Sequence, residues 1–258
     1  MELFVTFGRW DIYLLVLARV AGVVGVAPVF GNRAIPNQVK VGLALVLTLL
    51  LAPMQAQAAG GGTVPGWITL AVAMSGEVLV GLLMGFAGMI VFSAVQIASR
   101  LIGVQLGLGM PGTMDPMWTE SGSFLDTFYG MLALIVFLSI GGHYLIITAL
   151  SRSFDLVPVG TYGLRAATGA NLVALSSAAF TTALHLSIAA VGTMLLTDMT
   201  MGLVVRTIPQ MNVFAVGLPV KIIVGLLVLS ALMPWTLAGF ADMGRSVSRA
   251  MMAMLPQP

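Results

Sequence analysis

Cysteine does not occur in the 258 residues, and histidine occurs only twice, at His143 and His185. The absence of cysteine excludes disulfides, thiol catalysis and cysteine-type metal sites. Two histidines cannot complete the coordination shell of a metal ion without other ligands. We therefore expect neither a metal site nor a cofactor.

Charged residues are also scarce, at 8% of the sequence, whereas a soluble domain carries about 25%. No stretch holds enough of them to coat a surface that faces water. The net charge is only +2 and the basic residues are scattered, which argues against a nucleic acid as a partner. No basic n-region or small-residue cleavage site precedes the first apolar run, so we expect no cleaved signal peptide.

Enzyme motifs are missing as well. The sequence has no G-x-x-x-x-G-K-[S/T], G-x-S-x-G or H-E-x-x-H pattern, so nucleotide hydrolysis and the common hydrolase mechanisms have no support. No recognisable nucleophile motif lies near His143. We expect no catalytic residue and interpret His143 as a hydrogen-bonded packing residue.

Hydrophobic residues make up 59% of the sequence, which predicts an integral membrane protein. We expect an all-α, polytopic fold of helical hairpins with broken helices, forming a single helical membrane domain over residues 1–258. Six apolar segments can be recognised, at residues 12–30, 41–52, 67–98, 128–149, 172–205 and 213–240.

The lengths of these segments are irregular. As a helix, segment 41–52 would reach roughly 18 Å and segment 67–98 roughly 48 Å, whereas the hydrocarbon core is about 30 Å thick. Basic residues divide almost evenly between the two sides of a six-span scheme, so the positive-inside rule assigns no orientation. Both observations favour helices that pack against partner subunits instead of lipid.

Small residues and isolated charges predict close helix packing. Gly81 and Gly85 form a G-x-x-x-G pair, which lets another backbone approach one face of the helix. The charges inside apolar runs include two of each sign, and we expect them to neutralise one another across helices. A proton or ion path through Glu77 and Asp198 is the alternative. We assign buried charge or packing roles to Arg19, Glu77, Gly81, Gly85, His143, Asp198, Arg206 and Lys221.

One break in the apolar sequence stands out, at residues 107–117, with three glycines, two prolines and three methionines. Glycine frees the backbone, proline stops helices, and methionine fills irregular apolar holes. We interpret this loop as a soft plug rather than a catalytic loop, with a plain surface turn as the alternative. The expected plug residues are Gly107, Gly109, Met110, Pro111, Gly112, Met114, Asp115, Pro116 and Met117.

A series of landmarks runs from Arg19 to about Pro234. In order, they are Arg19 with Ala27-Pro-Val-Phe-Gly-Asn-Arg-Ala-Ile-Pro36; Glu77 with Gly81 and Gly85; Gly103-Val-Gln-Leu-Gly-Leu108 before Asp115-Pro116; Gly142-His-Tyr-Leu-Ile-Ile; Ser153-Phe with Pro158-Val-Gly160; and Arg206-Thr-Ile-Pro-Gln-Met-Asn-Val-Phe214 before Gly217-Leu-Pro-Val-Lys221. Together these landmarks resemble the FliR family, membrane proteins of the flagellar type III export gate, whose virulence-system relatives include SpaR and SctT.

The resemblance implies a hetero-oligomer in the bacterial inner membrane, within the flagellar basal body. Proteins of this family assemble with FliP-like and FliQ-like subunits into a helical cone, and their chain looks like a FliP-like portion followed by a FliQ-like portion. FlhA-like and FlhB-like export components and transported unfolded proteins are further implied partners. The family loop at 107–117 plugs the closed pore, although this sequence is richer in glycine and less aromatic there than its relatives.

Three other functions stay open at this point. A virulence export-gate subunit would share the same landmarks. A small-solute secondary transporter also combines broken helices with intramembrane charges, but such proteins usually show related halves, and no internal repeat is recognisable here. A purely structural anchor of the export apparatus is compatible with most of the same residues.

Overall fold

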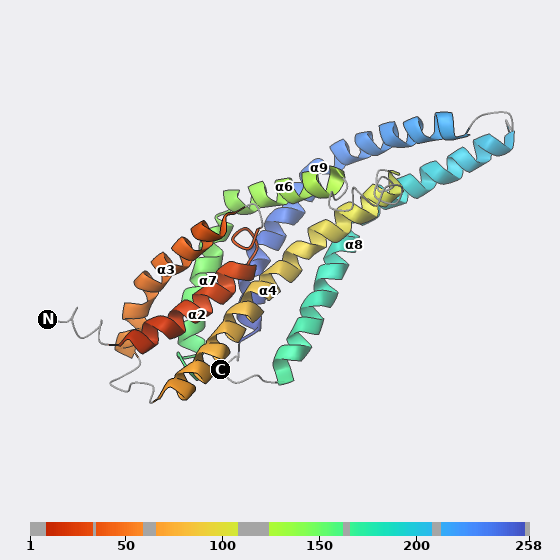
Figure 1. Ribbon diagram of the computed structural model, residues 1–258. Helices are drawn as coiled ribbons and strands as arrows, with labels where there is room; N and C mark the ends of the chain where they lie inside the picture. Colours follow the sequence, from red (N-terminus) through yellow and green to blue (C-terminus); the bar gives the residue numbers. More distant parts are fainter. Residues whose placement is uncertain are drawn as a thin grey trace. The chain divides into compact units, whose positions relative to one another are not determined.

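The computed structural model describes residues 9–32, 35–58, 66–107, 124–161, 166–207 and 213–255 (Figure 1). Within these ranges the chain forms helices and no strand, so the all-α prediction is confirmed. The helices are α2 (Trp10–Val26), α3 (Asn37–Ala58), α4 (Trp67–Gln105), α6 (Phe124–Ser139), α7 (Gly142–Leu156), α8 (Ala166–Thr207) and α9 (Val213–Ala253).

Helix α3 corrects the expectation of a segment too short to cross a membrane. It has 22 residues and continues through Pro53, where the apolar run was expected to end. A proline inside a helix removes one backbone hydrogen bond, but methionine, glutamine and alanine, which follow it, are good helix formers. Residues Asn37–Ala56 are therefore long and apolar enough to span a bilayer.

The segment expected at 128–149 is interrupted. Helix α6 ends at Ser139 and α7 begins at Gly142, and the backbone between them turns through Gly141, whose φ is +73°. Glycine adopts this left-handed conformation without steric cost, so the adjacent pair Gly141 and Gly142 explains the break. Helix α9, in contrast, runs beyond the expected end at residue 240 to Ala253.

Four described helices are long and apolar enough to cross a membrane, namely α3, α4, α8 and α9, and the broken pair α6 and α7 raises the number to five. Helix α2 has 17 residues and contains Arg19. The prediction of a polytopic membrane protein is confirmed.

The chain divides into two compact units. Unit 1 comprises residues 1–91, 141–176 and 245–258, and unit 2 comprises residues 92–140 and 177–244. Each has its own packing: in unit 1, Ala87, Ala250 and Met254 form a buried cluster. In unit 2, the rings of Tyr129 and Phe240 meet edge to face, 5.8 Å apart. The expectation of a single domain over residues 1–258 stays a prediction.

Candidate functional site

Helices α2 and α4 approach each other closely in unit 1, and glycine makes this possible. A Cβ atom added at Gly22 would lie 2.9 Å from the carbonyl oxygen of Val78, and one at Gly81 would overlap the carbonyl oxygen of Arg19. One turn further along α4, a Cβ at Gly85 would lie 3.1 Å from the backbone nitrogen of Ala27. The obstacles are backbone atoms, which cannot rotate away, so the two helices pack backbone to backbone here.

The close approach brings two opposite charges together. Arg19 of α2 and Glu77 of α4 are fully buried, at 0% and 1% exposure, and Arg19 Nε donates to Glu77 Oε2 over 2.5 Å. A lone buried charge costs several kcal/mol, so each of these side chains depends on the other. Arginine suits such a position because its planar group offers several donors in fixed directions.

The remaining donors of Arg19 reach the end of α7. Nη1 donates to the carbonyl oxygen of Ser153 at 3.1 Å and to its hydroxyl at 3.2 Å, and Nη2 donates to the carbonyl oxygen of Val157 at 3.0 Å. The guanidinium also lies 4.3 Å from the ring centre of Phe154, a cation–π contact. The last carbonyl groups of a helix lack partners within it and carry partial negative charge, so Arg19 stabilises the end of α7.

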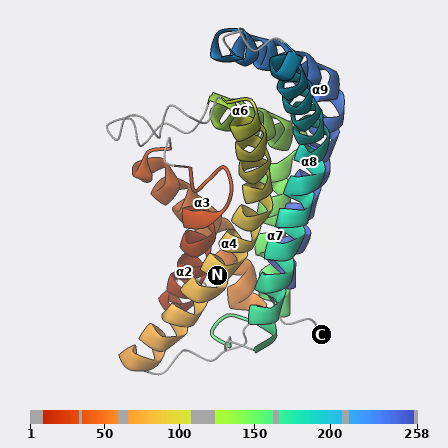
Figure 2. The same cartoon turned by 90° about the vertical axis from the view of Figure 1, so that its right-hand side faces the viewer.

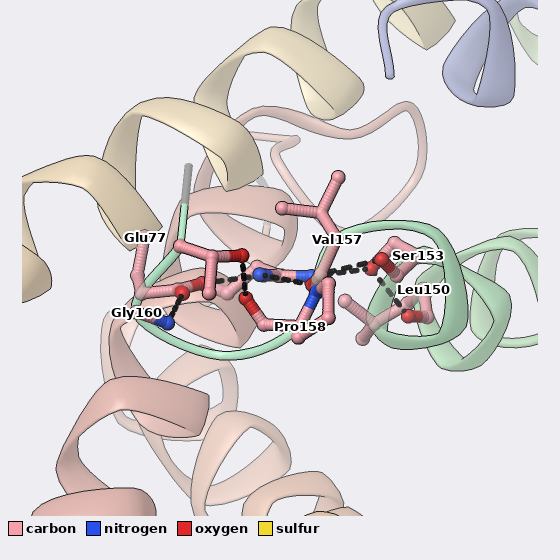
Figure 3. Close-up of polar contacts among 8 residues, drawn as sticks. Glu77, Leu150, Ser153, Val157, Pro158 and Gly160 are labelled. Atoms are coloured by element: carbon pink, nitrogen blue, oxygen red, sulfur yellow. Dashed lines mark hydrogen bonds and ion pairs between the residues drawn. The ribbon is translucent and has the colours of Figure 1, made fainter. Parts of the chain in front are cut away.

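The second oxygen of Glu77 holds the turn that follows α7. Glu77 Oε1 accepts a hydrogen bond of 2.7 Å from the backbone N–H of Gly160, whose φ is +80°. The hydroxyl of Ser153 donates a hydrogen bond to the carbonyl oxygen of Leu150 and accepts one from Arg19 Nη1. Figure 3 shows this network, with Glu77 and Gly160 at one end and Ser153 at the other. We call the set Arg19, Glu77, Ser153, Val157 and Gly160 the charge cluster.

Within the charge cluster, the charged groups are bonded to the protein itself. Both carboxylate oxygens of Glu77 accept hydrogen bonds from the protein, and all three nitrogens of Arg19 donate to it. Such an arrangement fixes three helices and a turn but presents neither charge to a substrate.

A second pair of charges lies in unit 2. Lys221 of α9 places its Nζ 2.7 Å from one carboxylate oxygen of Asp198 of α8 and 2.8 Å from the other. The pair joins the second half of α8 to the first half of α9, and these two parts run side by side (Figures 1 and 2). Lys221 is 20% exposed and Asp198 is 44% exposed, so this pair is accessible from outside the chain.

The family model for bacterial export proteins, family 1, matches residues 11–246. The chain belongs to this family. It is 31% identical over 234 residues to the flagellar biosynthetic protein FliR of Escherichia coli (strain K12), covering 89% of this chain and 88% of that protein. It is also 31% identical over 222 residues to the FliR protein of Bacillus subtilis (strain 168), covering 84% of each.

A third relative, the flagellar biosynthetic protein FliR of Caulobacter vibrioides (strain ATCC 19089 / CIP 103742 / CB 15), is 28% identical over 243 residues, covering 93% of this chain and 94% of that protein. The resemblance read from the landmarks is thereby confirmed. Together with its apolar helices, it identifies the chain as a multi-pass inner-membrane protein of bacterial flagellar export.

The predicted site residues differ in how deeply they are buried. Among the charges, Arg19 and Glu77 lie in the core of unit 1, whereas Asp198 and Arg206 are exposed in this chain by itself, which differs from the expected burial. Arg206 occupies the last turn of α8, where a cation interacts favourably with the helix dipole. His143 is half-buried against Tyr144, and its Nδ1 has no hydrogen-bond partner among the described residues.

The expected plug loop lies almost entirely outside the described residues. Only Gly107 is described, the second residue after the end of α4 at Gln105, and its φ of +74° favours glycine. Residues 108–117, and with them the other expected plug residues, lie beyond the described part of the chain.

Two sets of polar residues were not assigned a role from the sequence. Ser153 and Gly160 belong to the family landmarks, but nothing in the pattern links them to Arg19 and Glu77. In unit 2, the Ser99 hydroxyl of α4 donates to Asp126 Oδ1 of α6 over 2.5 Å, and Arg100 lies 3.7 Å from the other oxygen. Asp126 lies in the first turn of a strongly apolar helix, and an acidic residue at such a position is a recognisable signal.

Proposed function

We propose that the protein is a core subunit of the flagellar type III export gate, which helps to form and seal the pore through which unfolded flagellar proteins cross the inner membrane. The observation that carries this proposal is the family match over residues 11–246, together with relatives named flagellar biosynthetic protein FliR. These names favour the flagellar system over a virulence system.

The geometry of unit 1 supports a role without catalysis. The charge cluster uses its charges to hold α2, α4 and α7 together, and the part of the chain that the structure describes contains no group of three potential metal-binding side chains. We infer that the protein acts by its shape and by its place in an assembly, and not as an enzyme.

We further propose FliP-like and FliQ-like subunits as direct partners, with FlhA-like and FlhB-like components in the same apparatus. Helices α8 and α9 support this assembly because they bury few of their apolar residues within the chain. Large apolar surfaces on a protein mark contacts with other proteins or with lipid. Affinity purification of the tagged protein from its own host should recover these unlike membrane subunits, whereas a lone monomer or homo-oligomer would contradict the assembly.

Deleting the gene in its own host tests the function directly. We expect loss of flagellar filaments and of secreted flagellar proteins, with both restored by a plasmid copy of the gene. Cytoplasmic levels of the cargo proteins serve as the control, because a defect in synthesis would lower them and a defect in export would not. Normal secretion in the deletion strain would contradict the proposal.

The plug role of residues 107–117 is proposed from the family resemblance and from composition. Methionine side chains exclude water without a fixed geometry, so such a loop suits a seal that must open. Deleting residues 109–114 should raise ion leakage across membranes that contain the assembled complex. Unchanged conductance with normal assembly would refute the plug and leave a structural anchor as the role of the subunit.

A further inference from the structure

The end of α4 packs against α8 and α9 in unit 2 through one leucine. Leu106 directly follows α4 and is 1% exposed, and its backbone N–H still donates to the carbonyl oxygen of Ile102 over 2.9 Å. A Cβ atom added at Gly225 of α9 would overlap Leu106 Cδ2 and would lie 3.6 Å from the sulfur of Met194 of α8. The side chain of Leu106 therefore fills the space that a larger residue at position 225 would need. We call Leu106, Met194 and Gly225 the leucine contact.

The leucine contact fixes the end of α4 from one side. Leu106 is buried, whereas Val104, two residues earlier, is 71% exposed. Directly after the leucine, a Cβ at Gly107 would lie 3.3 Å from Leu218 Cδ1, which stands on α9 two helical turns before the leucine contact. The place at which the chain leaves α4 is therefore set by side chains and backbone of α9.

Apolar packing alone holds this end of α4. Among the described residues, no hydrogen bond or ion pair joins positions 101–107 to α8 or α9. By comparison, the ion pair of Lys221 and Asp198 joins α9 to α8, and Ser99 of α4 donates a hydrogen bond to Asp126 of α6. Protein interiors are packed so closely that a change of one methyl group is felt. The position of the end of α4 therefore depends on the fit of Leu106 at Gly225.

A second glycine of α9 receives a leucine in a similar way. A Cβ at Gly239 would lie 2.6 Å from Leu186 Cδ2 of α8, and Leu186 is also buried. This leucine lies inside its helix, so the contact joins two continuous helices. Leu106, in contrast, stands between α4 and the segment that is expected to plug the pore. Gly239 is therefore a matched site, where the same substitution disturbs packing on α9 without touching the end of α4.

We propose that Leu106 is a positioning residue for the resting seal, because its contact with Gly225 and Met194 holds the end of α4 in the place from which the following segment starts. This proposal rests on the plug role proposed above for residues 107–117. Helices α8 and α9 thus contribute to the seal through the place that they give to the end of α4.

Potassium efflux from vesicles that contain the assembled complex, purified from its own host, measures the seal. Gly225→Ala places a methyl group where Leu106 lies, and Leu106→Ala removes the side chain that makes the contact. Both substitutions should raise the efflux several-fold at equal amounts of complex. Leu106→Met keeps an unbranched apolar side chain of similar volume and should keep the efflux low.

Two further glycine substitutions are the controls. Gly239→Ala disturbs the packing of α8 on α9, and Gly192→Ala adds a Cβ that meets nothing within 4 Å. We expect neither of them to raise the efflux. If Gly239→Ala leaks as much as Gly225→Ala, the effect is one of general packing, and the positioning role is refuted. Loss of the assembled complex with both Gly225→Ala and Leu106→Ala would also overturn the proposal, because the contact would then serve assembly.

The deletion of residues 109–114, measured in the same vesicles, separates this proposal from the plug role. If the deletion raises the efflux and the substitutions at Gly225 and Leu106 do not, the plug role stands and the leucine contact has no part in the seal. If neither the deletion nor the substitutions raise the efflux, the plug role and this proposal are both wrong.

Discussion

The substitution Gly81→Ala tests the contact on which the charge cluster depends. The added methyl group would overlap the carbonyl oxygen of Arg19 and would lie 3.0 Å from Gly22 Cα and from the backbone nitrogen of Val23. All three obstacles belong to the backbone of α2, so only a separation of α2 from α4 relieves the overlap. That separation also lengthens the bond between Arg19 and Glu77.

The expected loss follows from two opposing effects. Overpacking in a core costs about 1–3 kcal/mol, and backbone obstacles place this site near the upper end, about 3 kcal/mol. Replacing glycine by alanine inside a helix returns about 1 kcal/mol, because alanine has the higher helix propensity. The net loss of about 2 kcal/mol should lower the melting temperature by roughly 4–8 °C for a chain of this size.

The assay is the fraction of purified, detergent-solubilised protein that remains monodisperse after heating. Gly25→Ala on α2 is the matched control, because a Cβ there meets nothing within 4 Å. We expect this control to be as stable as the unsubstituted protein or slightly more stable. If Gly81→Ala melts together with Gly25→Ala, the backbone contact does not have the role assigned to it.

The same heating assay checks three further substitutions. Glu77→Ala leaves the buried guanidinium of Arg19 without a countercharge and should lower the free energy of unfolding by about 3–5 kcal/mol. The double variant with Arg19→Met should lose less, because no charge is left unpaired. A double variant less stable than Glu77→Ala would contradict the pairing. Lys221→Met should cost about 1 kcal/mol or less, because Asp198 is 44% exposed and its charge is screened; a loss as large as that of Glu77→Ala would show that this pair is also buried in the tested state. Asp126→Ala should cost about 0.5–1.5 kcal/mol, because the buried hydroxyl of Ser99 loses a charged acceptor but keeps the carbonyl oxygen of Gln96 as a second one. An unchanged melting temperature would show that this bond does not stabilise unit 2.

Composition and spacing predicted the fold class and several details of the helices. The low share of charge predicted a polytopic helical protein, and the run at 67–98 predicted most of α4. The predicted end of α3 near Pro53 was wrong, because one proline costs less than the packing and helix propensity of the residues on both sides contribute. The break between α6 and α7 could have been read from the adjacent glycines at 141 and 142.

Only part of the charge cluster could be predicted from the sequence. The opposite signs of Arg19 and Glu77 inside apolar runs predicted neutralisation, but two bases and two acids allow more than one pairing. The carbonyl oxygens of Ser153 and Val157 could not be foreseen, because every residue carries such an acceptor. Only the fold selects which carbonyl groups stand at the end of a helix near a buried guanidinium.

The glycine contacts and the charge cluster depend on each other. Arg19 and Glu77 are 58 residues apart in sequence, and they meet because Gly22 and Gly81 let the two helices touch next to them. The pair then fixes the end of α7 and the turn at Gly160, which have no other charged partner within the charge cluster. A larger residue at the glycine contact would therefore disturb the turn at Gly160 without touching it. Segments near residues 19, 77–81 and 153–160, which resembled one family as separate landmarks, act in the folded chain as one structural element.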